Sequence, residues 1–180
     1  MSKRRKRLAA LLLIATVAVA TYIAANAGPA FRHPVVALRL ITSDAPAALP
    51  VPVRGVKPAQ LVNTWGAPRS GGRSHRGIDI FARRGTEIVS TTSGIVVTVG
   101  HSELGGRIVR VLGPGGYWHY YAHLERFGDM RPGDVIAAGT VIGYVGDSGN
   151  ARGTPPHLHY GLYCFRGGAV NPYVFLRGSV

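Results

Sequence analysis

Histidines and a carboxylate with the spacing of metal ligands stand in two segments of the chain. His75 and Asp79 lie in the segment HRGID, and His157 and His159 lie in PHLHYG, about eighty residues later. Two neutral imidazoles and one carboxylate make up a typical three-ligand open zinc site, in which a further position stays free for water. The set therefore indicates metal-assisted hydrolysis rather than a structural metal clip.

Each pair of these residues also predicts its own local structure. His157 and His159 are two residues apart, so on a strand both side chains project from one face and can line one cleft. His75 and Asp79 are four apart, which would make them neighbours on a helix. Gly77 between them and the glycines before them favour instead a loop that leads into a strand. Either pair alone is weak evidence for a metal, because such pairs also occur on solvated surfaces.

Short strands are the elements that must position these residues. The 25 glycines and 12 prolines separate β-branched runs, which is the pattern of a mostly β fold. The predicted strands span residues 86–90, 94–99, 107–112, 117–123, 140–145 and 157–163. The segment RPGDVIAAGTVIGYVG predicts a tight β arch, with one turn at Pro132–Asp134 and a second at Ala138–Gly139.

The chain is strongly basic, with a formal net charge of +13. Five of its 21 basic residues form the cluster Lys3–Arg7, and the other 16 still exceed the 8 acidic residues. A basic surface suits an anionic polymer. We do not expect nucleic acid as the partner, because the remaining arginines are scattered and no recognition helix carries them. The single Cys164 excludes an intrachain disulfide.

The N-terminus predicts export. The basic cluster precedes an apolar run of 18 residues, Leu8–Ala25, which is long for a signal-peptide core and just long enough to span a bilayer. Ala25-Asn26-Ala27 fits a small-x-small cleavage site, so residues 1–27 are either a cleaved signal peptide or a signal anchor in the cytoplasmic membrane. Residues 28–59 are rich in Pro and Ala and predict a semi-extended spacer, with strand composition at Val35–Ile41.

The motifs taken together resemble a known family. GGRSHRGIDIFARRGTEIVSTTSGIVV, YYAHL, GDVIAAGTVIGYVGDSGN and PHLHYGL follow one another in the order found in the M23 peptidases, the LytM/lysostaphin-type zinc endopeptidases of peptidoglycan. The resemblance covers about Val62–Leu176. It implies an M23-like domain at residues 60–180, with one Zn²⁺ held by His75, Asp79 and His159.

The resemblance also assigns the two remaining histidines of the motifs. His157 and His123 match the catalytic histidines of the family that do not bind the metal. Hydrolysis of an amide needs the oxyanion stabilised and the leaving amine protonated, and histidines near neutral pKa suit both tasks. The division of these tasks between His123 and His157 does not follow from the sequence.

Other polar residues near the motifs have a functional and a structural interpretation. Tyr121 can hydrogen-bond a substrate near the metal, although strand tyrosines more often pack as half-buried aromatics. Asn150 and Arg152 lie in the loop before the ligand strand, which borders the cleft in the family, so they are candidate substrate contacts. Turn formation is the alternative for Asn150. His119 shares a predicted strand face with Tyr121 and His123, which would allow it to support the metal ligands or contact substrate, but we expect a simple surface histidine.

The sequence therefore predicts a compact antiparallel β-sheet domain with a barrel-sandwich-like arch, preceded by an N-terminal transmembrane or signal helix. Its predicted function is zinc-dependent cleavage of peptide bonds in peptidoglycan cross-links or stem peptides, on the extracytoplasmic side of the membrane. Two alternatives keep the same fold. One is a non-enzymatic cell-wall binding or amidase-activating protein, and the other is a zinc peptidase that acts on exported proteins or glycine-rich peptides.

Overall fold

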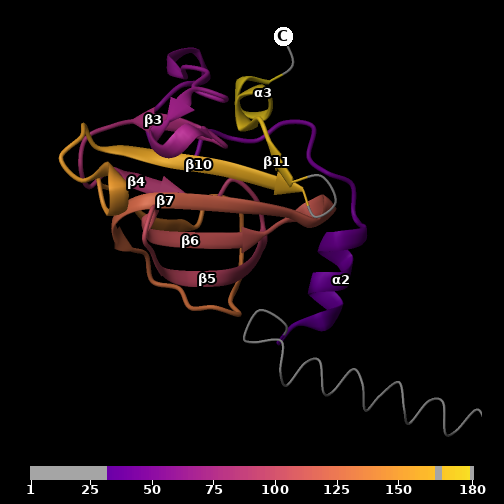
Figure 1. The fold of residues 1–180 in the computed structure, drawn as a ribbon. Coiled ribbons are helices and arrows are strands. Elements are labelled where there is room, and N and C mark those ends of the chain that lie inside the picture. The colour runs from indigo at the N-terminus through magenta and orange to yellow at the C-terminus, as the bar shows by residue number, and fades with distance from the viewer. Residues whose placement is uncertain (1–31, 165–167, 179–180) are drawn as a thin grey trace, which may run out of the picture.

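The structure is a computed structural model that describes residues 32–164 and 168–178, and it is built mainly from antiparallel strands (Figure 1). The strands are β1 (Pro68–Arg69), β2 (Arg73–Ser74), β3 (Ile78–Phe81), β4 (Glu87–Val89), β5 (Gly94–Ser102), β6 (Gly106–Leu112), β7 (Tyr117–Phe127), β8 (Val135–Ile136), β9 (Val141–Val145), β10 (His157–Cys164) and β11 (Gly168–Val170). The helices are α2 (Pro34–Thr42) and α3 (Pro172–Arg177), with short 3-10 turns η2 (Pro58–Gln60), η3 (Ser70–Gly72), η4 (Pro114–Gly116) and η5 (Gly149–Ala151). The prediction of a mostly β antiparallel domain is confirmed.

One sheet of nine strands dominates the described chain, beside a two-stranded ribbon of β1 and β2. The main path runs β11-β10-β7-β6-β5-β8, while β3 pairs with β10, and β9 pairs with both β4 and β7. Strand β10 therefore pairs with β3, β7 and β11, and it brings residues from distant parts of the chain side by side.

Six of these strands, β4, β5, β6, β7, β9 and β10, coincide with the predicted ones to within a few residues. Consecutive strands β8 and β9 pair with different partners, β5 on one side and β4 and β7 on the other, as the chain must do in a β arch. The turns of this segment use glycines with positive φ, Gly133 at 100° and Gly139 at 84°, a conformation that glycine adopts without steric cost.

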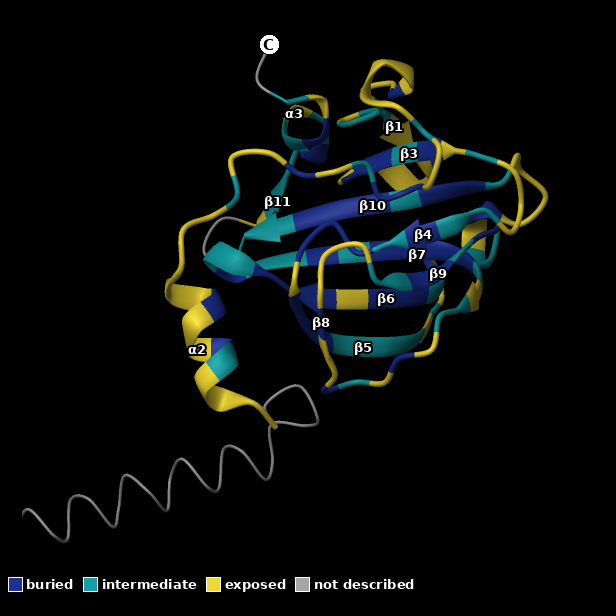
Figure 2. Cartoon of the chain, turned by 180° about the vertical axis from the view of Figure 1, so that it is seen from behind, coloured by how far each residue is buried: buried dark blue, intermediate teal, exposed yellow. Residues whose placement is uncertain are grey.

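The sheet presents one face to the hydrophobic core. On β6, Val109 and Val111 are fully buried whereas Arg110 between them is exposed, as the alternation of side chains along a strand requires. The core cluster joins residues of β3, β4, β6, β7 and β10, among them Ile78, Ile88 and Leu158. Figure 2 shows β10 as buried over most of its length.

The prediction of a semi-extended spacer with strand composition at Val35–Ile41 is wrong for this segment, because it forms helix α2. Pro34 occupies the first helical position, where its fixed φ and missing N–H are tolerated. Ala37 and Leu40, three residues apart, lie on one helix face. They are buried in a second cluster with Ile95 and Leu112, so tertiary burial of a helical stripe outweighs the β-branched composition.

The predicted spacer is in part packed on the domain. Leu49 and Val53 belong to the core cluster, and Val53 forms an isolated bridge with Ile88. The predicted signal peptide or anchor at residues 1–27 lies outside the described residues. Among the described helices, none combines the length and the apolar character needed to cross a bilayer.

Candidate metal centre

Two paired strands and the loop before one of them hold the three predicted metal ligands. In the antiparallel register of β3 and β10, Asp79 lies directly opposite His159, so both side chains project from the same face of the sheet. His75 lies in the loop that leads into β3, and its backbone N–H donates to Ala67 O at 2.9 Å. The expected loop-then-strand arrangement of His75 and Asp79 is confirmed.

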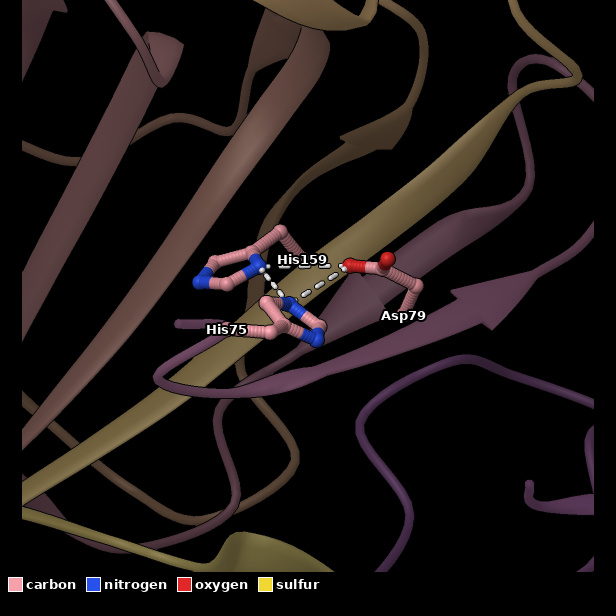
Figure 3. Close-up of side chains that lie close together, drawn as sticks. All are labelled: His75, Asp79 and His159. Carbon is pink, nitrogen blue, oxygen red and sulfur yellow. Dashed lines mark hydrogen bonds and ion pairs between the residues drawn. The ribbon is translucent and has the colours of Figure 1, made fainter. Parts of the chain in front are cut away.

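The three side chains converge on one point, as Figure 3 shows. His75 Nε2 lies 2.8 Å from His159 Nδ1, and each of these nitrogens lies 3.2 Å from Asp79 Oδ1. All three donor atoms lie within 4.8 Å of one another, and His75 and Asp79 are largely shielded from solvent. Two nitrogens and one carboxylate oxygen that share a single small space fit the donor set of an open zinc site.

Backbone carbonyls fix the orientation of the site histidines. His75 Nδ1 donates to Thr64 O at 2.7 Å, which leaves Nε2 with its lone pair toward the centre. A ring N–H held by a carbonyl oxygen sets the tautomer and the ring orientation of a metal-binding histidine. His75 is thereby arranged as a ligand by its own loop.

Asp79 is held in its ionised form. Burial acts to raise the pKa of Asp79, but the close ring nitrogens of His159 and His75 outweigh burial and hold it well below its usual range. The second carboxylate oxygen, Oδ2, pairs with the guanidinium of Arg69 on β1. Burial also lowers the pKa of His159, so the centre contains neutral imidazole and charged carboxylate, the forms that bind a metal.

Gly77 leaves room for the His159 ring. A Cβ at this position would lie 2.6 Å from Tyr160 O and 2.7 Å from His159 Cε1, closer than carbon atoms pack. Gly77 therefore lets the loop before β3 pass directly over the ligand strand β10.

His123 and His157 lie beside the centre, as predicted. Their ring centroids are 5.0 Å apart, and the His123 ring lies 5.9 Å from that of His159. His157 Nε2 lies 3.9 Å from Asp79 Oδ1. His123 Nδ1 donates to Ser148 O at 2.8 Å, and His157 Nδ1 donates to Pro155 O at 2.9 Å. The Nε2 atom of each ring is therefore available as an acceptor.

The backbone at His123 explains how this side chain reaches the cleft. His119 and Tyr121 of β7 point into the core, and strict alternation would place His123 there as well. His123 instead has φ of 65°, the one positive φ among described non-glycine residues, and the ladder of β6 and β7 shifts register between Tyr121 and Leu124, on either side of it. The kink changes the phase of β7, so Leu124 enters the core and His123 faces the site.

Burial lowers the pKa of His123 to about 4, against the smaller opposing effect of its bond to Ser148 O. The imidazole is therefore neutral over most of the pH range. A neutral ring with a lone pair on Nε2 can accept a proton from water or substrate.

A cleft of about 1200 Å³ surrounds the centre and contains His123, His157 and the three candidate ligands. Asn150 is exposed and lines this cleft, in keeping with the predicted substrate contact. Arg152 is exposed but is not among the cleft-lining residues.

The expected substrate contact of Tyr121 requires correction. Tyr121 is fully buried, and its hydroxyl lies 3.0 Å from both Thr91 N and Thr91 Oγ1. The adjacent Tyr120 has the opposite strand parity and lines the cleft instead, with its ring 5.9 Å from that of His159. The sequence YYAH offered both tyrosines, and the strand register decides between them.

The expected surface position of His119 is also wrong. Its side chain is fully buried in a polar network, 2.9 Å from Thr91 Oγ1 and 2.8 Å from the Tyr160 hydroxyl through Nδ1. His119 and Tyr121 are two residues apart on β7, so their side chains lie on the same face of the sheet. A core position for Tyr121 would therefore have predicted a core position for His119.

An open three-donor centre flanked by two further histidines in a cleft is the arrangement of a metal-dependent hydrolase. The comparisons with known proteins agree. Residues 73–172 match peptidase family M23, and the chain belongs to this family.

Relatives of the chain include the L-Ala–D-Glu endopeptidase of Bacillus subtilis, 38% identical over 141 residues, which are 72% of this chain and 43% of that protein. Lysostaphin of Staphylococcus simulans is 35% identical over 91 residues, 49% of this chain and 18% of that protein. The chain thus spans less than half the length of these relatives.

Solved structures show the same fold. The catalytic domain of lysostaphin, an antimicrobial peptidase, superposes with a TM-score of 0.56 at 30% identity, over 63% of this chain and 88% of that one. The catalytic domain of the prophage-encoded M23 protein EnpA from Enterococcus faecalis gives a TM-score of 0.55 at 29% identity, over 75% and 97% of the two chains.

Proposed function

We propose that the chain is a zinc-dependent endopeptidase that hydrolyses peptide bonds in peptidoglycan cross-links or stem peptides during cell-wall remodelling. The observation that carries the proposal is the convergence of His75 Nε2, Asp79 Oδ1 and His159 Nδ1 within 4.8 Å, in a cleft that also contains His123 and His157. Membership of peptidase family M23 supports it, as does the relative named for cleavage of the L-Ala–D-Glu bond. The proposal includes export of the domain, which the N-terminal sequence favours.

When bound by His75, Asp79 and His159, zinc supplies a Lewis acid and a water molecule of lowered pKa. His123 and His157 then share the proton chemistry, because both side chains line the cleft and each has its Nδ1–H held by a carbonyl oxygen. Hydrolysis breaks the amide C–N bond, adds the hydroxyl of water to the carbonyl carbon and delivers a proton to the leaving amine. A histidine that has accepted the proton of water is the donor for that amine, and its N–H stabilises the oxyanion before transfer.

Metal content tests the ligand set. The full-length chain should contain one zinc per molecule by mass spectrometry of the metal, and His159→Ala should lose it. His101→Ala is the matched control, because His101 is exposed and packs on Phe127 away from the centre. Full zinc content in His159→Ala refutes the assignment.

Cleavage tests the reaction. Purified peptidoglycan is incubated with wild type, His123→Ala and His101→Ala, and new amine ends are counted by mass spectrometry of the released peptides. We expect activity in wild type and His101→Ala, and a loss of about 100-fold or more in His123→Ala. Equal activity in all three would refute the role of His123. A zinc-loaded chain that cleaves no wall preparation would support a non-enzymatic wall-binding role, and cleavage of exported or glycine-rich peptides alone would indicate the other alternative.

A further inference from the structure

The cleft has a marked excess of positive charge beside the metal centre. Four arginines line it, Arg69, Arg73, Arg76 and Arg110, whereas Asp79 is the only acidic residue among the described residues that do so. Arg69 pairs with Asp79, and Arg73 bonds to the backbone and hydroxyl oxygens of Ser70. Within the described chain, neither Arg76 nor Arg110 has a carboxylate within 4.0 Å. These two guanidiniums are therefore available to an anionic ligand.

Arg110 faces the cleft because of strand register. In the ladder of β6, β7 and β10, Arg110 lies opposite Tyr120, and Tyr120 lies opposite Gly161. Gly161 lies on the same face of β10 as His159, since their positions differ by two along the strand. Arg110 thus shares one face of the sheet with the metal centre, and the neighbouring valines of β6 face the core.

Aromatic rings connect Arg110 to the centre. The Arg110 guanidinium carbon lies 5.5 Å from the centre of the Tyr120 ring, and that ring lies 5.9 Å from His159. The guanidinium is at most the sum of these two steps from the ligand imidazole. An extended peptide rises about 3.3 Å per residue. A substrate bound along this path therefore spans the distance from the metal to Arg110 with about three residues.

Arg76 lines the same cleft, and its backbone lies beside the strand that carries His159. Its carbonyl oxygen would lie 3.3 Å from a Cβ at Gly161, and the Tyr163 ring would lie 2.9 Å from that Cβ. Burial and the neighbouring Tyr120 raise the pKa of Tyr163, while the positive charges of Arg110 and Arg76 act to lower it. The Tyr163 ring lies 6.3 Å from the Tyr120 ring that Arg110 contacts, and all these side chains line one cleft with Arg76.

We propose that Arg110 and Arg76, which line the cleft together with Tyr120 and Tyr163, form a carboxylate-binding subsite that selects peptide substrates with a free carboxylate within about three residues of the scissile bond. The guanidinium fork matches a carboxylate in two parallel hydrogen bonds, and stacking on a tyrosine keeps it planar and oriented. This inference rests on the proposed peptidase function and adds a substrate preference to it.

The test uses two synthetic cross-linked stem peptides of the same sequence. The acid peptide has free carboxylates, and in the amide peptide these groups are carboxamides. Wild-type full-length chain should have a kcat/KM about ten-fold or more higher for the acid peptide, because a charge-assisted pair is lost with the amide. In Arg110→Gln and Arg76→Gln this ratio should fall toward one, and Arg110→Lys should keep part of it. Arg131→Gln, an exposed arginine outside the cleft, should keep the wild-type ratio.

Binding of both peptides is measured in parallel by calorimetry, which separates the two proposals. Acid-selective binding that Arg110→Gln abolishes, without any cleavage, would support the subsite and overturn the endopeptidase function alone. Cleavage of both peptides with equal kcat/KM by wild type would overturn the subsite and leave the peptidase standing. A preference that persists in the double variant Arg76→Gln/Arg110→Gln would also overturn the subsite. Thermal unfolding of each variant confirms that it is folded.

Discussion

Acid should destabilise this domain through His119, which the sheet buries completely. Burial lowers the pKa of His119 to about 3, whereas a histidine in an unfolded chain has a pKa of about 6.5. Nδ1 is occupied by Thr91 and Tyr160, and Nε2 has no hydrogen-bond partner in the described part of the chain. A second proton on the ring therefore has no acceptor to compensate its charge.

The sign of the effect follows from proton linkage. Between about pH 6.5 and pH 3 the unfolded chain binds a proton that the folded chain does not bind, so the free energy of unfolding falls as the pH is lowered through this window. Above this window the ring is neutral in both states, and the contribution is constant. Each pH unit inside the window removes up to about 1.4 kcal/mol. Two units therefore remove about 2–3 kcal/mol, a large share of the roughly 5–15 kcal/mol of a typical domain.

The assay is urea unfolding of wild type and His119→Gln at a series of pH values from neutral to mildly acidic, followed by tryptophan fluorescence. Glutamine keeps a polar group but does not titrate. Wild type should be the more stable protein at neutral pH, and its advantage should shrink as the pH falls. Burial also lowers the pKa of His123, but His123 is present in both proteins and cancels in the difference. His101→Gln, which changes an exposed histidine, should keep the wild-type slope. Parallel pH curves for wild type and His119→Gln would refute the reasoning.

Three further substitutions test the site and the packing. Gly77→Ala should lower zinc affinity about ten-fold or more in a chelator competition. Gly100→Ala is the control and should bind zinc normally, because its new methyl group would meet its nearest neighbour at 3.8 Å. Equal affinities of the two variants would contradict the close approach of Gly77 to the His159 ring. Leu158→Ala, in the core, should lower the free energy of unfolding by about 2–5 kcal/mol in urea. Val174→Ala, at an exposed position of α3, should lower it far less, and similar values for the two would contradict the core assignment. Asn171→Ala removes the side-chain oxygen that caps α3 and should cost about 0.5–2 kcal/mol, and an unchanged unfolding midpoint would contradict the cap.

The sequence predicted the regular part of the fold because that part is local. Strand β10 has aromatic and apolar residues between turn-rich segments, so its existence and the common face of His157 and His159 followed from the pattern. Helix α2 was missed because its apolar stripe becomes decisive only when Ile95 and Leu112 are in place to cover it. Burial against a partner that is distant in sequence cannot be seen in a local window.

The position of each side chain relative to the cleft was less predictable. A period of two along β7 implies that His119, Tyr121 and His123 share a face, and this holds for the first two only. The left-handed backbone at His123 breaks the period, and the surrounding structure maintains it through bonds to Gly105 and Ser148. The sequence motif therefore located the catalytic candidate, but the fold decided that it faces the cleft while Tyr121 does not.

The way the histidines are held links the chemistry of the site to the path of the backbone. His75, His123 and His157 each donate a ring N–H to a main-chain carbonyl oxygen. A carbonyl acceptor does not depend on the side chain of the residue that carries it, so substitutions at Thr64, Ser148 or Pro155 that keep the backbone should keep the ring orientation. Insertions or deletions in these loops move the acceptors and release the rings. The orientation of the rings should therefore depend on loop length, whereas the side chain of Thr64 acts on the site separately, by accepting from the Asp79 N–H at 3.0 Å.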